Sequence, residues 1–169
     1  MGLFHHDDEP HRRFKMQQKL VSIGDDYWIE DDDGHRAYKV NGKAARKRET
    51  FILEDLHGHK VAKIQEKALS VRNKVKIDLD VGSATVKKAI VGIRDRFEID
   101  IDDGPDLKAH GNFVDHEYKI ERKGDTIAAI SKKWFRARDT YGIDVYDENA
   151  TVLLLSITVA IDALANDLL

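Results

Sequence analysis

The chain has 169 residues, which is enough for one domain with a sizeable core. Its formal net charge of −3 excludes the strong overall basic field that is typical of nucleic-acid-binding proteins. There is no cysteine, so disulfides and thiolate chemistry are excluded. The N-terminal residues lack the apolar segment of a secretory signal, and we therefore expect a cytoplasmic protein.

The first 13 residues are polar and without periodicity, and are predicted to be a mobile arm preceding one domain over 14–169. Within that domain a unit repeats every 21 to 24 residues or so. Each copy places an aromatic or branched residue two positions before an aliphatic one, an alternation that indicates a strand. These pairs are Tyr27 and Ile29, Phe51 and Leu53, Val75 and Ile77, Phe97 and Ile99, Tyr118 and Ile120, and Tyr141 and Ile143.

A turn rich in Asp or Gly follows nearly every copy, and a second strand begins after it. These turns fall at 31–34, 55–58, 80–82, 102–104 and 123–125. The count comes to about twelve short strands, and short connections make neighbouring strands antiparallel. Because closure removes exposed sheet edges, and a barrel of this size has room for a plug, we predict a mainly β protein built as a closed antiparallel barrel.

The plug is predicted to be the C-terminal segment, as a helix over about 150–167. The stretch 149–161 carries no charged residue, and a helix that is apolar on every face belongs in a protein interior. It is shorter than a membrane span, which needs about 18 apolar residues. Asn149 or Thr151 is expected to cap its N-terminus. A surface helix and a membrane tail are the alternatives.

Several segments together resemble the LURP-one-related family, which belongs to the tubby C-terminal-like superfamily along with phospholipid scramblases. They are QKL at 18–20, GDDYWI at 24–29, VAKI at 61–64, SKKWF at 131–135 and DTYG at 139–142. The resemblance covers about 14–167 and implies a twelve-stranded barrel threaded by a hydrophobic C-terminal helix. Tubby relatives bind phosphoinositides through basic residues, but the motifs do not place those residues in this chain.

No common enzyme signature is present: there is no G-x-S-x-G, H-E-x-x-H, P-loop or G-x-G-x-x-G sequence. Three groups of histidines with carboxylates are candidate sites. They are His5, His6 and His11 with Asp7 and Asp8, then His57 and His59 with Asp55, and finally Asp115 with His116. Each is interpreted as a solvated tail or a polar turn rather than a metal or acid–base site. No catalytic residue, metal or cofactor is predicted.

Basic residues cluster in four of the connections that alternate with the Asp/Gly turns, and alternation places those connections together at one barrel end. The candidate anion-binding residues are Arg46, Lys47, Arg48, Arg72, Arg94, Arg96, Arg136 and Arg138. We call this set the basic rim. Arginine offers paired donors to phosphate and carboxylate groups. The alternative is that these side chains keep the end soluble and pair with Glu49, Asp95 and Asp139.

The segment 131–135 combines two cations with two aromatic rings and is predicted to be one strand. Alternation would then put Lys133 and Phe135 on one face and Lys132 and Trp134 on the other, with one pair facing the core. Lys132, Lys133 and Trp134 are candidates for lipid contact, against an ordinary packing role for the rings.

We therefore expect a non-enzymatic binding or tethering module that recognises anionic ligands, such as lipid headgroups, at the basic rim. The alternatives are a protein-interaction scaffold with no small ligand and an unrecognised enzyme. A lipid or a protein is the expected partner, with no nucleic acid and no transmembrane segment. Such a protein would be cytoplasmic and peripheral at the membrane, and the sequence leaves its oligomeric state open.

Overall fold

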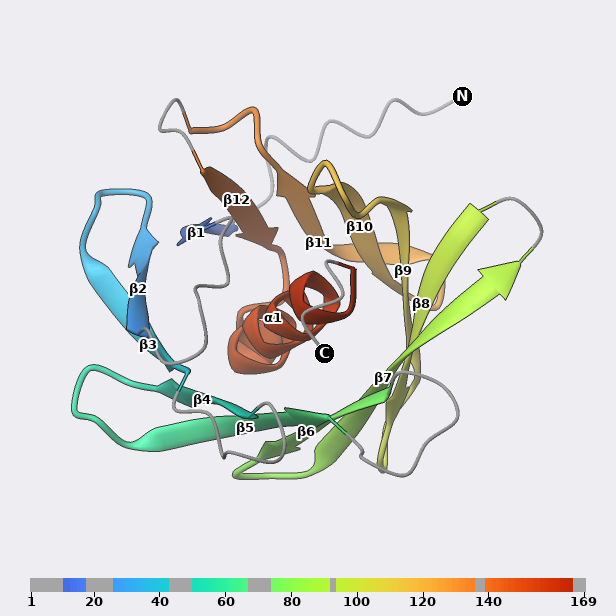
Figure 1. Ribbon diagram of the computed structural model, residues 1–169, viewed down its shortest axis with the longest axis horizontal. Coiled ribbons are helices and arrows are strands. Elements are labelled where there is room, and N and C mark those ends of the chain that lie inside the picture. Colours follow the sequence, from blue (N-terminus) through green and yellow to red (C-terminus); the bar gives the residue numbers. More distant parts are fainter. Residues whose placement is uncertain are drawn as a thin grey trace.

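The computed structural model describes residues 11–17, 26–42, 50–66, 74–91, 94–135 and 139–165. It is a closed barrel of twelve antiparallel strands around one helix, which confirms the predicted fold class (Figure 1). The strands are β1 (Arg12–Gln17), β2 (Asp26–Asp31), β3 (Arg36–Asn41), β4 (Thr50–Glu54), β5 (Lys60–Glu66), β6 (Lys74–Leu79), β7 (Ser83–Val91), β8 (Arg94–Ile101), β9 (Leu107–Asn112), β10 (Glu117–Arg122), β11 (Asp125–Ser131) and β12 (Thr140–Val145).

Each strand pairs with the next one in the chain, and β1 pairs with β12 to close the ring. Phe14 of β1 lies opposite Ile143 of β12 in this closing pair. Because all neighbours are antiparallel, successive connections alternate between the two ends of the barrel. The turns after β2, β4, β6, β8 and β10 therefore share one end, as predicted, and we call it the acidic end. The chain also leaves β12 at this end.

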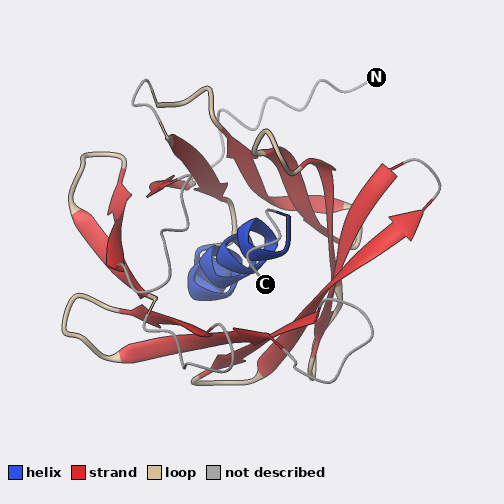
Figure 2. Cartoon of the chain, viewed as in Figure 1, coloured by secondary structure: helices blue, strands red, loops and turns tan. Residues whose placement is uncertain are grey.

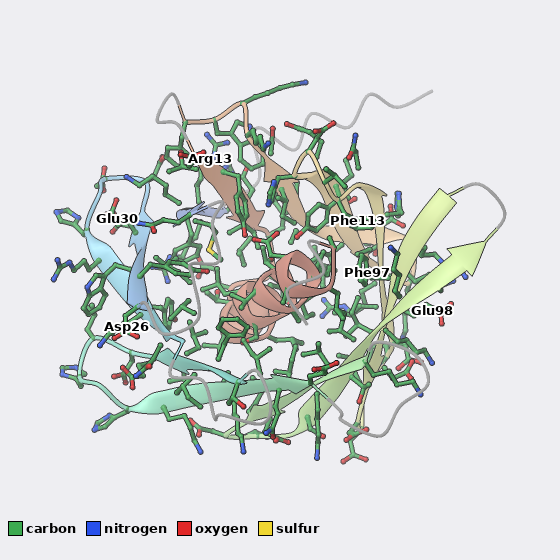
Figure 3. All side chains as sticks on the ribbon, in the orientation of Figure 1. Arg13, Asp26, Glu30, Phe97, Glu98 and Phe113 are labelled. Carbon is green, nitrogen blue, oxygen red and sulfur yellow. The ribbon has the colours of Figure 1, made fainter. Side chains whose placement is uncertain are left out.

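The predicted alternation within strands is confirmed by burial. Of the paired positions, Tyr27, Ile29, Leu53, Val75 and Ile77 are all buried, and their strand neighbours face outward. Phe97 of β8 and Phe113 of the β9–β10 turn pack edge to face inside the ring, with centroids 4.7 Å apart (Figure 3). The core is thus made by the inward faces of the strands and by the helix.

The helix α1 (Thr151–Ala165) follows a 3-10 turn, η2 (Glu148–Ala150), and runs through the barrel (Figure 2). Every residue from Leu154 to Leu164 is buried, as the apolar composition predicted. The expected cap is wrong: the Asp147 carboxylate accepts the N–H of Asn149, while the Thr151 hydroxyl donates to the carbonyl of Glu148. The segment Glu148–Ala165 is apolar and long enough to cross a membrane, but 67% of it is buried inside the barrel. Its composition is accounted for by the core.

Two boundaries differ from expectation. β1 begins at Arg12, so Arg12 and Arg13 belong to the barrel rather than to the predicted arm, whose first ten residues lie outside the described ranges. β11 ends at Ser131, so the single strand predicted over 131–135 is wrong. The chain bends there, and Trp134 and Phe135 both pack against the outward-facing Gly142 of β12. Side chains alternate between two faces only where a strand continues, and β11 ends at the start of this segment.

Candidate functional site

Two hairpins, β2–β3 and β4–β5, are neighbours at the acidic end (Figure 1). Their residues form the wall of a surface pocket of about 440 Å³. The start of β1 lies beside them, because β1 pairs with β2. The residues that line the pocket are Arg12, Asp31, His35, Arg36, Ala37, Tyr38, Asp55, Leu56 and His57. We call it the rim pocket.

The two hairpin turns share a five-residue pattern, Asp-x-x-Gly-His, at 31–35 and 55–59. In the first turn the Oδ1 atom of Asp31 accepts the N–H groups of Asp33 and His35, at 3.0 and 2.8 Å. In the second, the Oδ1 atom of Asp55 accepts from His57 and His59, at 2.8 and 3.0 Å. The glycine of each turn has a positive φ, which a residue with a side chain rarely adopts.

These backbone donors lower the pKa of Asp31 and of Asp55, in each case chiefly through the N–H of the histidine four residues later. The second oxygen of each carboxylate lies 3.5 Å from Nδ1 of that same histidine, His35 or His59. Both carboxylates are therefore hydrogen-bonded within their own turns, and these bonds stabilise their charged form.

The two arginines of the rim pocket, Arg12 and Arg36, lie against aromatic rings. The Arg12 guanidinium lies 5.0 Å from the ring centroid of Phe14, and that of Arg36 lies 4.7 Å from the ring of Trp28. Both side chains are exposed, and neither forms a salt bridge with a carboxylate within the described ranges. A guanidinium held over an aromatic face keeps its N–H groups available to an incoming anion.

The chemistry of the rim pocket follows from this arrangement. Two guanidinium groups can donate to phosphate or carboxylate oxygens, and the imidazole rings of His35 and His57 also line the pocket. Ala37, Tyr38 and Leu56 supply an apolar wall. This site was not predicted from the sequence, because Arg12 and Arg36 lie far apart in the chain and only the pairing of β1 with β2 brings them together.

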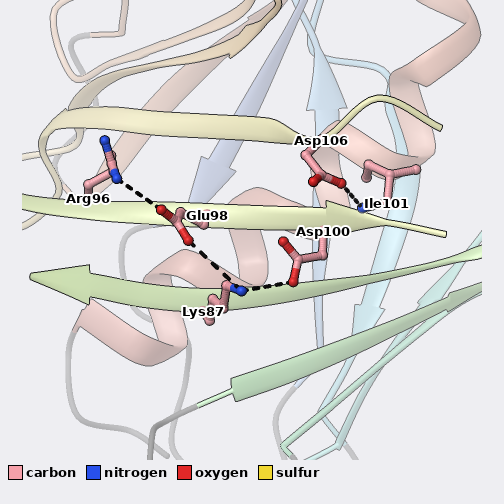
Figure 4. Close-up of polar contacts among 6 residues, drawn as sticks. All are labelled: Lys87, Arg96, Glu98, Asp100, Ile101 and Asp106. Atoms are coloured by element: carbon pink, nitrogen blue, oxygen red, sulfur yellow. Dashed lines mark hydrogen bonds and ion pairs between the residues drawn. The ribbon is translucent and has the colours of Figure 1, made fainter.

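Most of the predicted basic rim cannot be placed. Arg46, Lys47, Arg48, Arg72, Arg136 and Arg138 lie outside the described residues, and so does the side chain of Arg94 at the start of β8. Arg96 is described: its Nη2 atom donates to Oε1 of Glu98 at 2.9 Å, and Glu98 in turn lies near Lys87 (Figure 4). Arg96 is thus paired, but with Glu98 and not with the Glu49, Asp95 or Asp139 of the alternative interpretation, and a continuous basic patch stays a prediction.

The candidates for lipid contact, Lys132, Lys133 and Trp134, lie in the bend after β11. The backbone N–H of Lys132 donates to Glu117, and Lys133 is exposed. Trp134 lies on the outside of the barrel, where the guanidinium of Arg13 is 4.4 Å from its ring. The prediction that one of these pairs faces the core is wrong, because Trp134 covers β12 from outside. Lipid contact by these residues stays a prediction.

The three histidine groups lie in different parts of the chain. His5 and His6 lie outside the described residues. His57 and His59 lie in the second hairpin turn, as predicted, with ring centroids 6.1 Å apart. In the described part of the chain, the side chains that converge closely enough for a metal are Asp31, Asp33 and His35 of the first turn, and they are largely exposed.

The third group gives a site that the sequence analysis did not foresee. His116 is buried, and its Nε2 atom lies 2.9 Å from Oδ1 of Asp162 on α1. The Tyr141 hydroxyl donates to the other oxygen of Asp162, and its ring stacks on that of His116 with centroids 4.2 Å apart. Asp162 is the one charged residue in an otherwise apolar run, which was the available signal.

Burial raises the pKa of Asp162, while the contacts with His116 and Tyr141 act in the opposite direction. Burial also raises the pKa of Tyr27, Tyr118 and Tyr141, and the charge of Asp162 adds to each of these shifts. The five side chains therefore form one electrostatically coupled cluster inside the barrel, which we call the buried cluster.

Comparison with known proteins agrees with this architecture. A solved structure of a protein from Arabidopsis thaliana has a TM-score of 0.63 to this one, at 15% sequence identity, and the similarity covers 90% of this chain and 91% of that chain. At this identity the likeness shows the fold alone. No curated protein matches the chain. The family model described as LURP-one-related matches residues 12–162, which include all twelve strands and most of α1. The chain therefore belongs to the LURP-one-related family, as its motifs suggested.

Proposed function

We propose that this protein is a non-enzymatic binding module that recognises an anionic group, a phosphate or a carboxylate, in the rim pocket. The observation that carries the proposal is the pair of exposed arginines, Arg12 and Arg36, which line a pocket without a salt-bridge partner among the described residues. Arginine is the side chain best suited to such groups, because its planar fork donates two parallel hydrogen bonds.

The filled interior of the barrel supports a binding site at its surface, such as the rim pocket. The described core is filled by inward side chains and by α1, whose residues from Leu154 to Leu164 are buried. A ligand must therefore meet the protein at its ends or on its outer face. The rim pocket lies at one end, and rigid hairpins hold it.

The proposal moves the anion site from the predicted basic rim to the opposite end of the barrel. The anionic group can belong to a lipid headgroup or to a free phosphate, since both present the same oxygens to a guanidinium. A protein of this kind would work in the cytoplasm, and at the membrane surface if the phosphate belongs to a lipid.

The test is co-sedimentation with vesicles of phosphatidylcholine, with and without phosphatidylserine, alongside titration with inorganic phosphate. Trp28 lies under Arg36, so the fluorescence of a Trp134→Phe variant, which keeps Trp28 as its one tryptophan, should respond when the pocket is occupied. Each basic residue that engages anionic lipid contributes roughly 1 kcal/mol at low salt. The double variant Arg12→Gln/Arg36→Gln should therefore bind about 30-fold more weakly. Binding should also weaken as salt rises.

The matched control is Lys108→Gln/Lys119→Gln, which removes two exposed cations that do not line the pocket. It should bind like the wild type. Binding to phosphate without binding to vesicles would identify a free anion as the ligand, and the reverse would identify a lipid. Equal loss in both double variants, or no binding of either probe, would contradict the proposal.

The basic rim is the other candidate site for binding an anionic group. The triple variant Arg46→Glu/Arg94→Glu/Arg136→Glu should leave binding intact if the rim pocket is the site. Loss of binding in this variant alone would return the site to the basic rim. Binding to neutral vesicles as strongly as to anionic ones would instead favour a protein-interaction scaffold with an apolar surface.

A further inference from the structure

The strand β3 extends beyond its pairing with β4 at the acidic end of the barrel. Its pairing with β2 continues to Arg36, whereas its pairing with β4 ends at Lys39, which lies opposite Glu54. Within the described ranges, residues 36–38 therefore have no strand partner on the β4 side. The tips of the β2–β3 and β4–β5 hairpins stand apart from each other here (Figure 1). We call residues 36–38 the β3 edge.

The chain after β4 does not continue the pairing, because its backbone groups are used within its own hairpin. The N–H of Asp55 donates to the carbonyl of His59, and the carbonyl of Asp55 accepts the N–H of Gly58. Successive residues of a strand direct their N–H and C=O groups to opposite edges, so the three residues of the β3 edge direct at least one such set toward β4. An unpaired edge of this kind is a template for another strand.

The β3 edge faces the rim pocket. All three of its residues, Arg36, Ala37 and Tyr38, line the pocket, and so do residues 55–57 of the β4–β5 turn. Arg36 is exposed, and the other two are partly exposed. Leu56 of the turn is 59% exposed. The rim pocket is thus bordered by an accessible strand edge, with apolar side chains beside it.

The two arginines of the rim pocket lie on opposite faces of the barrel wall. Arg12 lies over the ring of Phe14, which is buried inside the barrel. Arg36 lies over the ring of Trp28, which faces outward because its neighbour Tyr27 is buried. Adjacent side chains of an added strand would point to these two faces in turn. Two adjacent acidic residues of such a strand would therefore approach the two guanidinium groups, one on each face.

We propose that the rim pocket binds an extended acidic peptide, which pairs with the β3 edge as an added strand and presents adjacent carboxylates to Arg12 and Arg36. This inference rests on the proposed anion site and names the class of molecule that carries the anion. In strand addition, main-chain hydrogen bonds supply affinity and alternate side chains supply specificity. A lipid headgroup or a free phosphate has no backbone to pair with the β3 edge, so the geometry favours a peptide.

The probe is a short peptide of threonine and valine with two adjacent glutamates at its centre, acetylated and amidated at its ends. Calorimetric titration of the full chain measures its affinity. Replacement of both glutamates by glutamine should weaken binding at least about tenfold, because hydrogen bonds to charged groups are lost. The Arg12→Gln/Arg36→Gln variant should no longer distinguish the two peptides. The control Lys108→Gln/Lys119→Gln should distinguish them as the wild type does.

Backbone methylation of the peptide tests strand addition without changing its charge. Two further peptides carry N-methyl groups on alternate residues, one in each of the two possible phases. Only one phase removes the N–H groups that face β3, and that peptide should bind up to about tenfold more weakly for each hydrogen bond lost. The other peptide should bind like the unmethylated one, because its methyl groups point away from the edge.

Hydrogen exchange locates the peptide on the protein. Binding of the unmethylated peptide should slow exchange at one or more amides of the β3 edge, and inorganic phosphate should not. The amide of Ile64 is the internal control, since β5 is paired with both β4 and β6 at this residue. Its exchange should stay the same.

The outcomes separate this inference from the proposed function. Equal binding of both methylated peptides, or binding without new protection at the β3 edge, would overturn strand addition and leave the anion site standing. Binding of phosphate or anionic vesicles, but of no peptide, would have the same meaning. If neither phosphate, vesicles nor peptide binds, the proposed function fails as well. Protection of the β3 edge that rises with protein concentration alone would assign it to a second copy of this chain and would also overturn the proposal.

Discussion

A Cβ atom on Gly142 would lie 2.7 Å from Cε3 of Trp134, so the absence of a side chain at this position is what lets the indole ring cover β12. Phe135 approaches the same point, at 2.9 Å. The guanidinium of Arg13 lies over the Trp134 ring, 4.4 Å from its centroid. The connection between β11 and β12 is thus fastened to the outside of the barrel by a contact that only glycine permits.

Gly142→Ala should therefore destabilise the protein by about 1–3 kcal/mol, the usual cost of overpacking. Urea unfolding, followed by circular dichroism, measures it. The cost should be smaller in a Trp134→Ala background, because the ring that clashes is then absent. An alanine variant as stable as the wild type would show that the two aromatic rings are not held against β12.

We expect that the protein cannot fold without the helix α1. Leu154 is fully buried, and Leu154→Ala should cost about 2–5 kcal/mol. Leu153→Ala is the natural control, since Leu153 is only partly buried and should cost less. Deletion of residues 150–169 should abolish cooperative thermal unfolding. A truncated protein with a native circular dichroism spectrum and a cooperative melt would contradict the central role of α1.

A paired charge contact joins β1 and β12, the two strands whose pairing closes the barrel. Nε of Arg13 donates to Oδ1 of Asp144 at 2.6 Å, and Nη2 donates to Oδ2 at 3.0 Å. The Asp144 carboxylate raises the pKa of Arg13, and Asp144 is only 3% exposed. Breaking a buried ion pair usually lowers the free energy of unfolding by about 3–5 kcal/mol. Asp144 is buried but Arg13 is partly exposed, so we expect Asp144→Ala to lower it by about 3 kcal/mol.

The control for that measurement is the Lys76–Asp78 pair on the outer face, where both side chains are close to half exposed. Asp78→Ala should change the free energy of unfolding by no more than about 1 kcal/mol. Equal effects in the two alanine variants would mean that the Arg13–Asp144 contact does not hold the closing strands together.

The hairpin turns of the rim pocket should loosen in acid. The pKa of Asp31 and that of Asp55 are lowered in the folded protein, so their contribution is present above the ordinary aspartate pKa and is lost as pH falls through the lowered value. Asp55→Ala should speed hydrogen exchange at the amides of His57 and His59 at neutral pH. Asp32→Ala should leave these amides unchanged, since Asp32 belongs to the other turn. Protection that survives in Asp55→Ala would contradict the role of this carboxylate.

Much of the architecture was readable from the sequence, because its causes are local. Alternation of Tyr27 with Ile29, and of Tyr141 with Ile143, reflects the two-residue period of a strand, and tight turns force neighbours to pair antiparallel. The charge-free run 149–161 identified a buried helix because no solvated helix has such a composition. Strand number, closure and the central helix all followed from these two signals.

The sites depended on contacts between residues far apart in the chain, and no local pattern encodes these. Arg12 and Arg36 line one pocket only because barrel closure brings β1 beside the first two hairpins. Periodicity suggested a core-facing pair within 131–135, but a bend after Ser131 turns Trp134 outward onto Gly142. Asp162 was visible only as an interruption of an apolar run. Its meaning depends on His116 and Tyr141, which tertiary packing alone brings to it, because a buried carboxylate is stable only where distant parts of the chain supply its partners.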